Sequence, residues 1–216
     1  MAILADLKPL IISEDMNTNT GAKKAAPECR YKGRETMKLD DPLTIDQIDF
    51  RIQSINKGGY ATILAYKDAR VDMHRLNTVF GVGKWQRKHE VINGRLFCSV
   101  GIWNDDIKEW AWVQDVGTES NTEKEKGQAS DSFKRACFNL GIGIELYDYP
   151  VIQVQLKKNE FEVDNGRVKA TWELKLKEWV WFSQFKDGQL VYLAAKDDSG
   201  LRFKWGVFQK GEEKAA

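Results

Sequence analysis

The sequence predicts an α+β fold in which an antiparallel three-stranded meander packs on a long helix, with a hairpin and a helix before it and a small β-rich appendage after it. Two observations predict the core: three strand-like runs follow one another between residues 85 and 117, and a helical stretch with an apolar stripe comes directly after them. The third observation is the size of the chain, since 216 residues with 42% hydrophobic content can bury one core with a small appendage.

The elements are expected in three parts of the chain. Residues 1–43 are polar and small without a sustained period, which predicts an extended or mobile arm. Residues 44–150 form the predicted core, and residues 151–216 a β-rich extension with a charged tail.

The core begins with a predicted hairpin and helix. Two apolar runs, TIDQIDFRIQSI and YATILAYKD, flank the turn NKGG and predict a hairpin. The next stretch predicts an amphipathic helix that ends at Gly81, because four apolar residues share one face: Ala69, Met73, Leu76 and Phe80.

The meander is predicted from WQRKHEVI, RLFCSVGIW and EWAWVQDVG, with turns at Asn93-Gly94 and at NDD. A helix to Leu140 follows, since Thr122 and Glu125 have capping-box spacing and Gly141 terminates it. Its apolar residues occupy an arc of about 100° that predicts packing: Ala129, Phe133, Ala136, Cys137 and Leu140. In the extension, strands are predicted in TWELKLKEWVWF, GQLVYLAA and LRFKWGVF, with turns at KDG and DDSG.

Charge is segregated along the chain although the formal net charge is +1. Residues 51–103 hold nine Lys/Arg against three Asp/Glu, and residues 104–131 hold three against eight. Three widely separated cysteines indicate neither a disulfide framework nor a zinc site and are typical of a reducing cytoplasm. The apolar N-terminal stretch is too short and too interrupted for a signal or membrane segment, so a soluble protein is expected.

The basic region combines cations with aromatic rings, as single-stranded nucleic acid requires. The residues are Arg51, Lys57, Lys67, Arg70, Lys84, Arg87, Lys88, Tyr60, Tyr66 and Trp85. In the competing interpretation the aromatics fill the core and the cations are only solvated. The alternation favours a core role for Trp85, Trp110 and Trp112, and leaves Arg51 and Lys57 open.

The predicted helix carries a second group of candidates beside its apolar stripe. Lys134 flanks the stripe, Arg135 points nearly opposite, Phe138 lies between these directions, and Lys126 projects one to two turns earlier. This side could contact phosphates. The residues taken alone favour a plainer interpretation, a surface ion pair between Asp131 and Arg135 at i, i+4 spacing.

Signs of catalysis are few. No nucleophile motif and no P-loop are present, so no catalytic residue, metal or cofactor is expected. Asp164, Glu173 and Lys175 loosely match the Asp…Glu-x-Lys arrangement of metal-dependent nucleases. The favoured interpretation of these residues is a half-exposed charged strand.

The motifs from RIQSI to GIGIELYD resemble the Rad52 superfamily of single-strand annealing proteins, especially phage and prophage versions, over roughly residues 45–150. The most specific are DVG at the end of the third strand, EK…SDSFKRA in the helix and GIG…LYD after it. The resemblance implies a β-β-β-α core, rings or curved filaments of subunits, and a basic groove that holds single-stranded DNA with its backbone inward and its bases outward.

By this resemblance the helix cations of the family fall on Lys126, Lys134 and Arg135, and the upstream arginine on Arg51. Tyr66 matches an aromatic residue of the same groove. Where some members carry another arginine one turn beyond the basic pair, this chain has Phe138, which weakens the phosphate contact or offers an apolar or stacking face.

The sequence therefore predicts a single-stranded DNA-binding protein that anneals complementary strands without ATP in homologous recombination and DNA repair. Its expected partners are single-stranded DNA, further copies of itself, and phage or host replication and recombination proteins, in the cytoplasm of a bacterial host cell. The alternatives are a single-strand binding protein that protects without annealing, and a metal-dependent nuclease.

Overall fold

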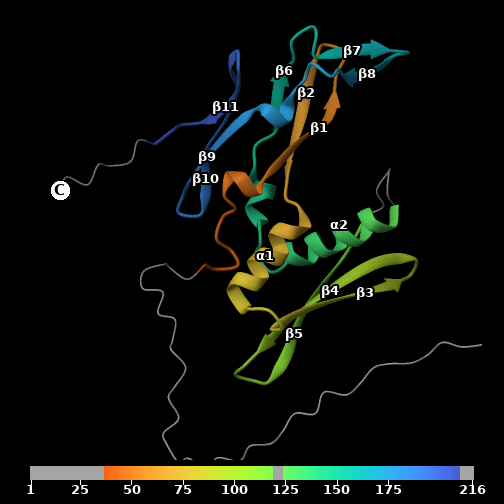
Figure 1. Cartoon of the computed structure of the whole chain (residues 1–216), viewed down its shortest axis with the longest axis vertical. Helices are drawn as coiled ribbons and strands as arrows, with labels where there is room; N and C mark the ends of the chain where they lie inside the picture. The colour runs from red at the N-terminus through yellow and green to blue at the C-terminus, as the bar shows by residue number, and fades with distance from the viewer. Residues whose placement is uncertain (1–36, 119–123, 210–216) are drawn as a thin grey trace, which may run out of the picture. The chain divides into compact units, whose positions relative to one another are not determined.

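The computed structural model describes residues 37–118 and 124–209, which form an α+β fold with antiparallel strand pairing and two α-helices (Figure 1). The elements are β1 Asp49–Ile55, β2 Tyr60–Tyr66, α1 Ala69–Phe80, β3 Trp85–Ile92, β4 Arg95–Asn104, β5 Glu109–Val116, α2 Lys124–Phe138, β6 Ile152–Gln155, β7 Phe161–Asp164, β8 Arg167–Ala170, β9 Val180–Lys186, β10 Gln189–Asp197 and β11 Gly200–Gly206.

The predicted meander is confirmed: β3, β4 and β5 pair in sequence order, each antiparallel to the next. One face of this sheet is covered by α2, which packs on β4 and β5 (Figure 1). The buried residues between them are Leu76, Cys98, Val100, Phe133, Ala136, Cys137 and Ile142. The apolar stripe read from the helix thus faces the sheet, as its spacing predicts.

A glycine with positive φ follows each helix. The carboxylate of Asp68 caps α1 by accepting from the Arg70 N–H, and Gly81 follows the helix with a φ of 88°. The second helix ends at Phe138, two residues before the predicted end, and Gly141 adopts a φ of 92° beyond it. The proposed capping box at Thr122 lies outside the described residues. Neither described helix is long and apolar enough to cross a lipid bilayer.

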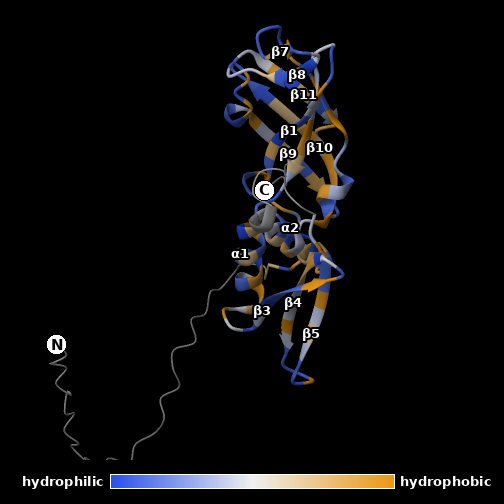
Figure 2. Ribbon diagram, turned by 90° about the vertical axis from the view of Figure 1, so that its right-hand side faces the viewer, coloured by the Kyte–Doolittle hydropathy of each residue, from blue (hydrophilic) through white to orange (hydrophobic). Residues whose placement is uncertain are grey.

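A second core lies between the β1–β2–β6 sheet and the β9–β10–β11 sheet. Hydrophobic residues, orange in Figure 2, recur between hydrophilic ones along these strands. The rings of Phe50 and Trp181 are stacked across this core, with centroids 3.6 Å apart and planes at 2°. The boundary expected at residue 150 therefore does not separate two cores, because β6 pairs with β2 and the last three strands cover the predicted hairpin.

The C-terminal strands agree only in part with the sequence-based expectation. GQLVYLAA and LRFKWGVF form β10 and β11, but in TWELKLKEWVWF only the end belongs to a strand. Its first half forms a turn in which Trp172 is 80% exposed, followed by a short 3-10 helix at Leu176–Glu178. The β7–β8 hairpin was missed, although Asn165-Gly166 is a typical hairpin turn.

The last part of the predicted arm is packed against the fold. Of the predicted arm, residues 1–36 lie outside the described residues, but residues 37–43 are held against the core. Leu43 is buried and its N–H donates to Glu145 Oε1 at 2.6 Å. The guanidinium of Arg75 donates to the carbonyl oxygens of Lys38 and Asp41. These contacts join the start of the described chain to the rest of the fold.

Candidate functional site

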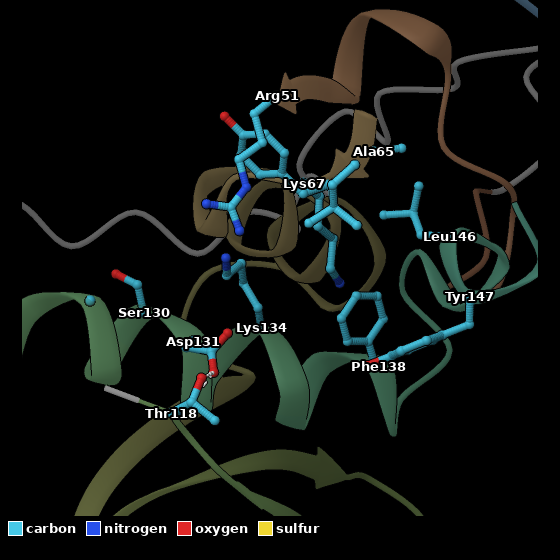
Figure 3. Close-up of a pocket in the computed structure, with 13 residues that line it drawn as sticks. Arg51, Ala65, Lys67, Thr118, Ser130, Asp131, Lys134, Phe138, Leu146 and Tyr147 are labelled. Atoms are coloured by element: carbon cyan, nitrogen blue, oxygen red, sulfur yellow. Dashed lines mark hydrogen bonds between the residues drawn. The ribbon is translucent and has the colours of Figure 1, made fainter. Parts of the chain in front are cut away.

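A groove with a cavity volume of about 710 Å³ lies between the β1–β2 hairpin, α2 and the chain that follows α2 (Figure 3). We call it the groove from here on. It is lined by Arg51, Leu64, Ala65, Tyr66, Lys67, Thr118, Gly127, Ser130, Asp131, Lys134, Phe138, Leu146 and Tyr147. The groove thus collects five of the candidate DNA contacts predicted from the sequence, from segments far apart in the chain: Arg51, Tyr66, Lys67, Lys134 and Phe138.

Strand alternation turns Arg51 toward the groove. Its neighbours Phe50 and Ile52 pack into the core between the two sheets, so Arg51 points from the opposite face of β1. Arg51 pairs with Leu64 on β2, and Tyr66 lies two residues further along that same face. The Arg51 guanidinium lies 5.5 Å from the centroid of the Tyr66 ring, within range of a cation–π interaction.

Lys134 reaches the groove from α2. Phe133, Ala136 and Cys137 are fully buried, which fixes the rotation of the helix and turns Lys134 to the half-exposed side. The pKa of the nearby Asp68 carboxyl is held below its usual value by its hydrogen bonds from Arg70, and the positive charge of Lys134 adds to this effect. Figure 3 shows Lys134 and Arg51 directed toward the same part of the groove.

The structure separates Arg135 from Lys134. Arg135 does not line the groove; its Nε donates to Asp115 Oδ1 on β5 at 3.3 Å. The alternative pairing of Asp131 with Arg135 is not formed either. Asp131 Oδ2 instead accepts from the N–H and the hydroxyl of Thr118, at 2.9 and 3.0 Å. Both side chains of the expected ion pair thus hold the end of β5 against α2.

Lys67 is buried below the groove, although the sequence groups it with the DNA-binding cations. It is 1% exposed, and its ammonium donates to Asp72 Oδ1 and to the carbonyl oxygen of Ile142. Burial lowers the pKa of the lysine, and burial raises the pKa of the Asp72 carboxyl to about 6, while the Lys67 charge opposes that rise. Lys67 therefore holds other residues in place and does not face solvent.

The aromatic end of the groove consists of Phe138 and Tyr147. The Lys67 ammonium lies 4.0 Å from the centroid of the Phe138 ring, and the Tyr147 ring lies 4.8 Å from it at an angle of 58°. Tyr147 is 63% exposed. A ring held by a buried cation thus stands beside a ring that solvent can reach (Figure 3).

Two further predicted contacts, Lys57 and Arg70, do not line the groove, and the structure does not describe the side chain of a third, Lys126. Lys57 lies exposed in the turn between β1 and β2. Arg70 donates through its Nε to Asp68 Oδ1 at 2.7 Å, so its charge is already paired at the surface. Lys126 lies within α2, but its side chain is outside the described residues.

The tryptophans expected in the core differ in their surroundings. Trp85 is half-buried, stacks on Phe133 with centroids 6.2 Å apart, and donates its Nε1–H to Asn77 Oδ1. Trp112 is 41% exposed, and a Cβ added at Gly101 would lie 2.9 Å from its ring, so the indole lies over that glycine. The core interpretation is right for Trp85 and wrong for Trp112, because alternation alone does not say which face of a sheet is covered.

The three residues of the nuclease alternative are not brought together. Asp164 pairs with Lys169 within the β7–β8 hairpin, at 3.0 Å. Glu173 and Lys175 line a different cavity of about 270 Å³, to which Asp164 does not contribute. In residues 37–118 and 124–209 no group of three or more His, Cys, Asp or Glu side chains is arranged to hold a metal ion.

Sequence reasoning missed Leu146, Tyr147 and Thr118 as groove residues. Gly141 and Gly143, both with positive φ, reverse the chain after α2 and bring Leu146 and Tyr147 back beside Phe138. Glycines directly after a helix are a signal of such a reversal. Thr118 could be found only from the contact of β5 with α2.

The chemistry available in the groove is that of binding. Arg51 and Lys134 supply two positive charges from different elements, and Tyr66, Phe138 and Tyr147 supply aromatic rings. Cations attract the phosphates of a nucleic acid, and aromatic rings stack on bases without regard to their identity.

Comparison with known proteins gives one match. A family model described as Rad52/22 family double-strand break repair protein matches residues 32–165, which is more than half of the chain. Searches of curated proteins and of solved structures each found no match. The matched segment contains every residue that lines the groove.

Proposed function

The chain belongs to the Rad52/22 family of double-strand break repair proteins, and on that basis we propose that it binds single-stranded DNA in the groove and anneals complementary strands without ATP. The proposal places the protein in homologous recombination. The finer assignment to the phage and prophage members, in the cytoplasm of a bacterial host, is part of the same proposal and is supported by the helix and turn motifs of the sequence.

The observation that carries the proposal is the meeting of Arg51 and Lys134 in one groove. The two residues are far apart in the chain and reach the groove from β1 and α2. Each is oriented by neighbours that are packed in a core, so the two charges are held in place before DNA arrives. Such preorganised cations favour a polyanion at low entropic cost.

In this proposal the protein promotes annealing by holding the strand in an extended arrangement, and no covalent bond is broken. The groove holds the strand by its phosphates, and copies of the chain side by side, in a ring or curved filament, keep successive stretches of the strand extended. A complementary strand then pairs with the bases that remain accessible. Replication and recombination proteins of the phage or host are the further partners that this role implies.

Lys134 and Arg135 provide the first test, because the structure gives these two neighbouring cations different surroundings. Lys134→Ala should weaken binding to single-stranded oligonucleotides of any sequence and flatten the slope of log affinity against log salt by roughly 0.7 per lost contact in each engaged subunit. Arg135→Ala should change the salt slope less, because Arg135 is paired with Asp115. Fluorescence anisotropy with labelled oligonucleotides from 50 to 300 mM salt measures both.

Lys177→Ala is the matched control, since this exposed lysine lies outside the matched segment and outside the groove. It should leave both the affinity and the slope unchanged. Folded Lys134→Ala and Arg51→Ala variants that bind as tightly as the parent across the salt range would show that the groove is not the binding site.

The two alternatives predict different outcomes in simple assays. A protein that only coats and protects DNA would bind labelled complementary oligonucleotides without accelerating their pairing. A nuclease would degrade the oligonucleotides when magnesium is added, and Glu173→Ala would stop the loss. Pairing that is accelerated without ATP, with intact oligonucleotides, is the outcome expected here.

A further inference from the structure

The lining of the groove is divided into two chemically different ends (Figure 3). At one end lie Arg51 and Lys134 together with the polar side chains of Thr118 and Ser130. At the other end lie Leu146, Tyr147 and Phe138. A site that bound only phosphates would need the first end alone. The second end therefore calls for a ligand with an apolar face.

One ring of the aromatic end contacts a buried cation, and the other ring is open to solvent. The Phe138 ring is held between the Lys67 ammonium, 4.0 Å from its centroid, and the Tyr147 ring at 4.8 Å. Lys67 in turn is fixed by Asp72 and by the carbonyl oxygen of Ile142. Tyr147 remains 63% exposed. A flat group that enters the groove can thus reach the tyrosine ring without unfolding the fixed part of the site.

The spacing of the two ends fits one nucleotide. Lys134 and Phe138 are four residues apart on α2, so they lie one above the other about one helical turn, roughly 5.4 Å, apart. In a nucleotide one sugar separates the phosphate from the base. If Lys134 binds the phosphate, the base therefore lies at a distance comparable to the spacing of Lys134 and Phe138. The base then lies at Phe138 and Tyr147, while the next phosphate along the strand stays within reach of the cationic end.

We propose that the aromatic end of the groove accepts one nucleobase of the bound strand, stacked on the Tyr147 ring beside Phe138. This inference rests on the proposed function, since it assumes that the phosphates of single-stranded DNA occupy Arg51 and Lys134. It departs from the arrangement in which every base points outward, because one base for each subunit is turned into the protein. That base is withheld from pairing until the complementary strand displaces it, while its neighbours stay available.

The test compares two ligands of equal length and charge, an oligothymidylate and an oligonucleotide of abasic sugars. Tyr147→Ala should weaken binding to the oligothymidylate by roughly 5- to 100-fold for each engaged subunit, because stacking on one base is lost. Binding to the abasic oligonucleotide and the salt slopes on both ligands should be unchanged. Tyr147→Phe keeps the ring and should bind like the parent.

Trp172→Ala is the matched control and should bind both ligands like the parent, because this ring is 80% exposed, does not line the groove and lies outside residues 32–165. The base subsite is disproved if Tyr147→Ala affects both ligands equally or neither of them. The proposed function fails in a different way, namely if the parent protein binds neither ligand or if Lys134→Ala weakens binding to neither. A Tyr147→Ala variant that loses its fold is replaced by Tyr147→Leu, for which the same loss on the oligothymidylate alone is expected.

Discussion

Lys67 shows how one buried charge can organise a binding site. Its ammonium contacts Asp72 on α1, the backbone of Ile142 after α2, and the ring of Phe138 on α2. Asp72 Oδ2 is buried without a hydrogen-bond partner among the described residues. Removing two charges from water is expensive, so this pair is kept by its contacts and its geometry more than by net stabilisation.

We predict that Lys67→Met destabilises the fold by about 3–5 kcal/mol at neutral pH, because it leaves the Asp72 carboxylate buried without its cation. The pKa of Asp72, already raised to about 6 by burial, should rise further in this variant. A carboxyl whose pKa is higher in the folded state than in the unfolded state favours folding at low pH, and this contribution is lost as the pH rises through the folded value.

The loss of stability in Lys67→Met should therefore be smaller at pH 5 than at pH 7.5. Urea unfolding at the two pH values measures this difference. The double variant Lys67→Met, Asp72→Asn removes both titrating groups, so its free energy of unfolding should depend less on pH between these two values than that of Lys67→Met. Equal losses in Lys67→Met at both pH values would contradict the role given to Asp72.

At the scale of elements, the junction between β5 and α2 determines where Lys134 is directed. Gly117 follows β5, and a Cβ added to it would lie 2.2 Å from Gln128 O and 2.8 Å from Ser132 N. Next to it, Thr118 donates to Asp131. The close approach of strand end and helix needs a residue without a side chain, which is the physical reason for a glycine in the motif DVG.

Gly117→Ala should destabilise the fold by about 1–3 kcal/mol, because the added methyl group meets backbone atoms that cannot turn aside. It should also weaken oligonucleotide binding, since it shifts α2 relative to the β1–β2 hairpin. Thermal unfolding and anisotropy measure the two effects. Gly58→Ala is the control, as this glycine lies in an exposed turn and its new methyl group would contact only side-chain atoms. Similar losses in both variants would contradict this account.

At the scale of the whole molecule, each three-stranded sheet of the described residues has edge strands to which no further strand is paired, although β6 and β11 contact each other. The three-stranded sheets end at β3 and β5, at β1 and β6, and at β9 and β11. Most of β3 is exposed along its length. Unpaired strand edges invite pairing with another chain unless they are protected. Repeated side-by-side contacts between identical chains would cover such edges and produce a ring or a filament.

We therefore predict that the protein is a homo-oligomer in solution. Multi-angle light scattering at micromolar concentration should give a mass of at least two 24.8 kDa chains for the protein alone, and of at least two chains plus the oligonucleotide when single-stranded DNA is bound. Lys134→Ala should keep this mass, because Lys134 is assigned to DNA. A species of 24.8 kDa under both conditions would exclude the oligomer.

Much of the fold could be predicted, while the site could be predicted only in part. The meander, both helices and the strands β10 and β11 follow from alternation, turn residues and an apolar stripe. Arg51, Tyr66, Lys134 and Phe138 were found as candidates by their type and by the resemblance, and the structure brings these four into one groove. The placements of Lys67, Arg135 and Tyr147 were not predictable, because each depends on a partner outside its own element.

The sequence by itself determined the local structure, because turns, helix ends and strand alternation depend on residues that are near neighbours in the chain. It also determined the family, through motifs that are each short and continuous in the sequence. Only the tertiary structure decided which charges are available. Lys67 is buried by contacts with Asp72 and Ile142, Arg135 is paired across to β5, and Lys134 lines the groove. Burial and ion pairing depend on which distant segments meet, and a one-dimensional pattern does not contain that information.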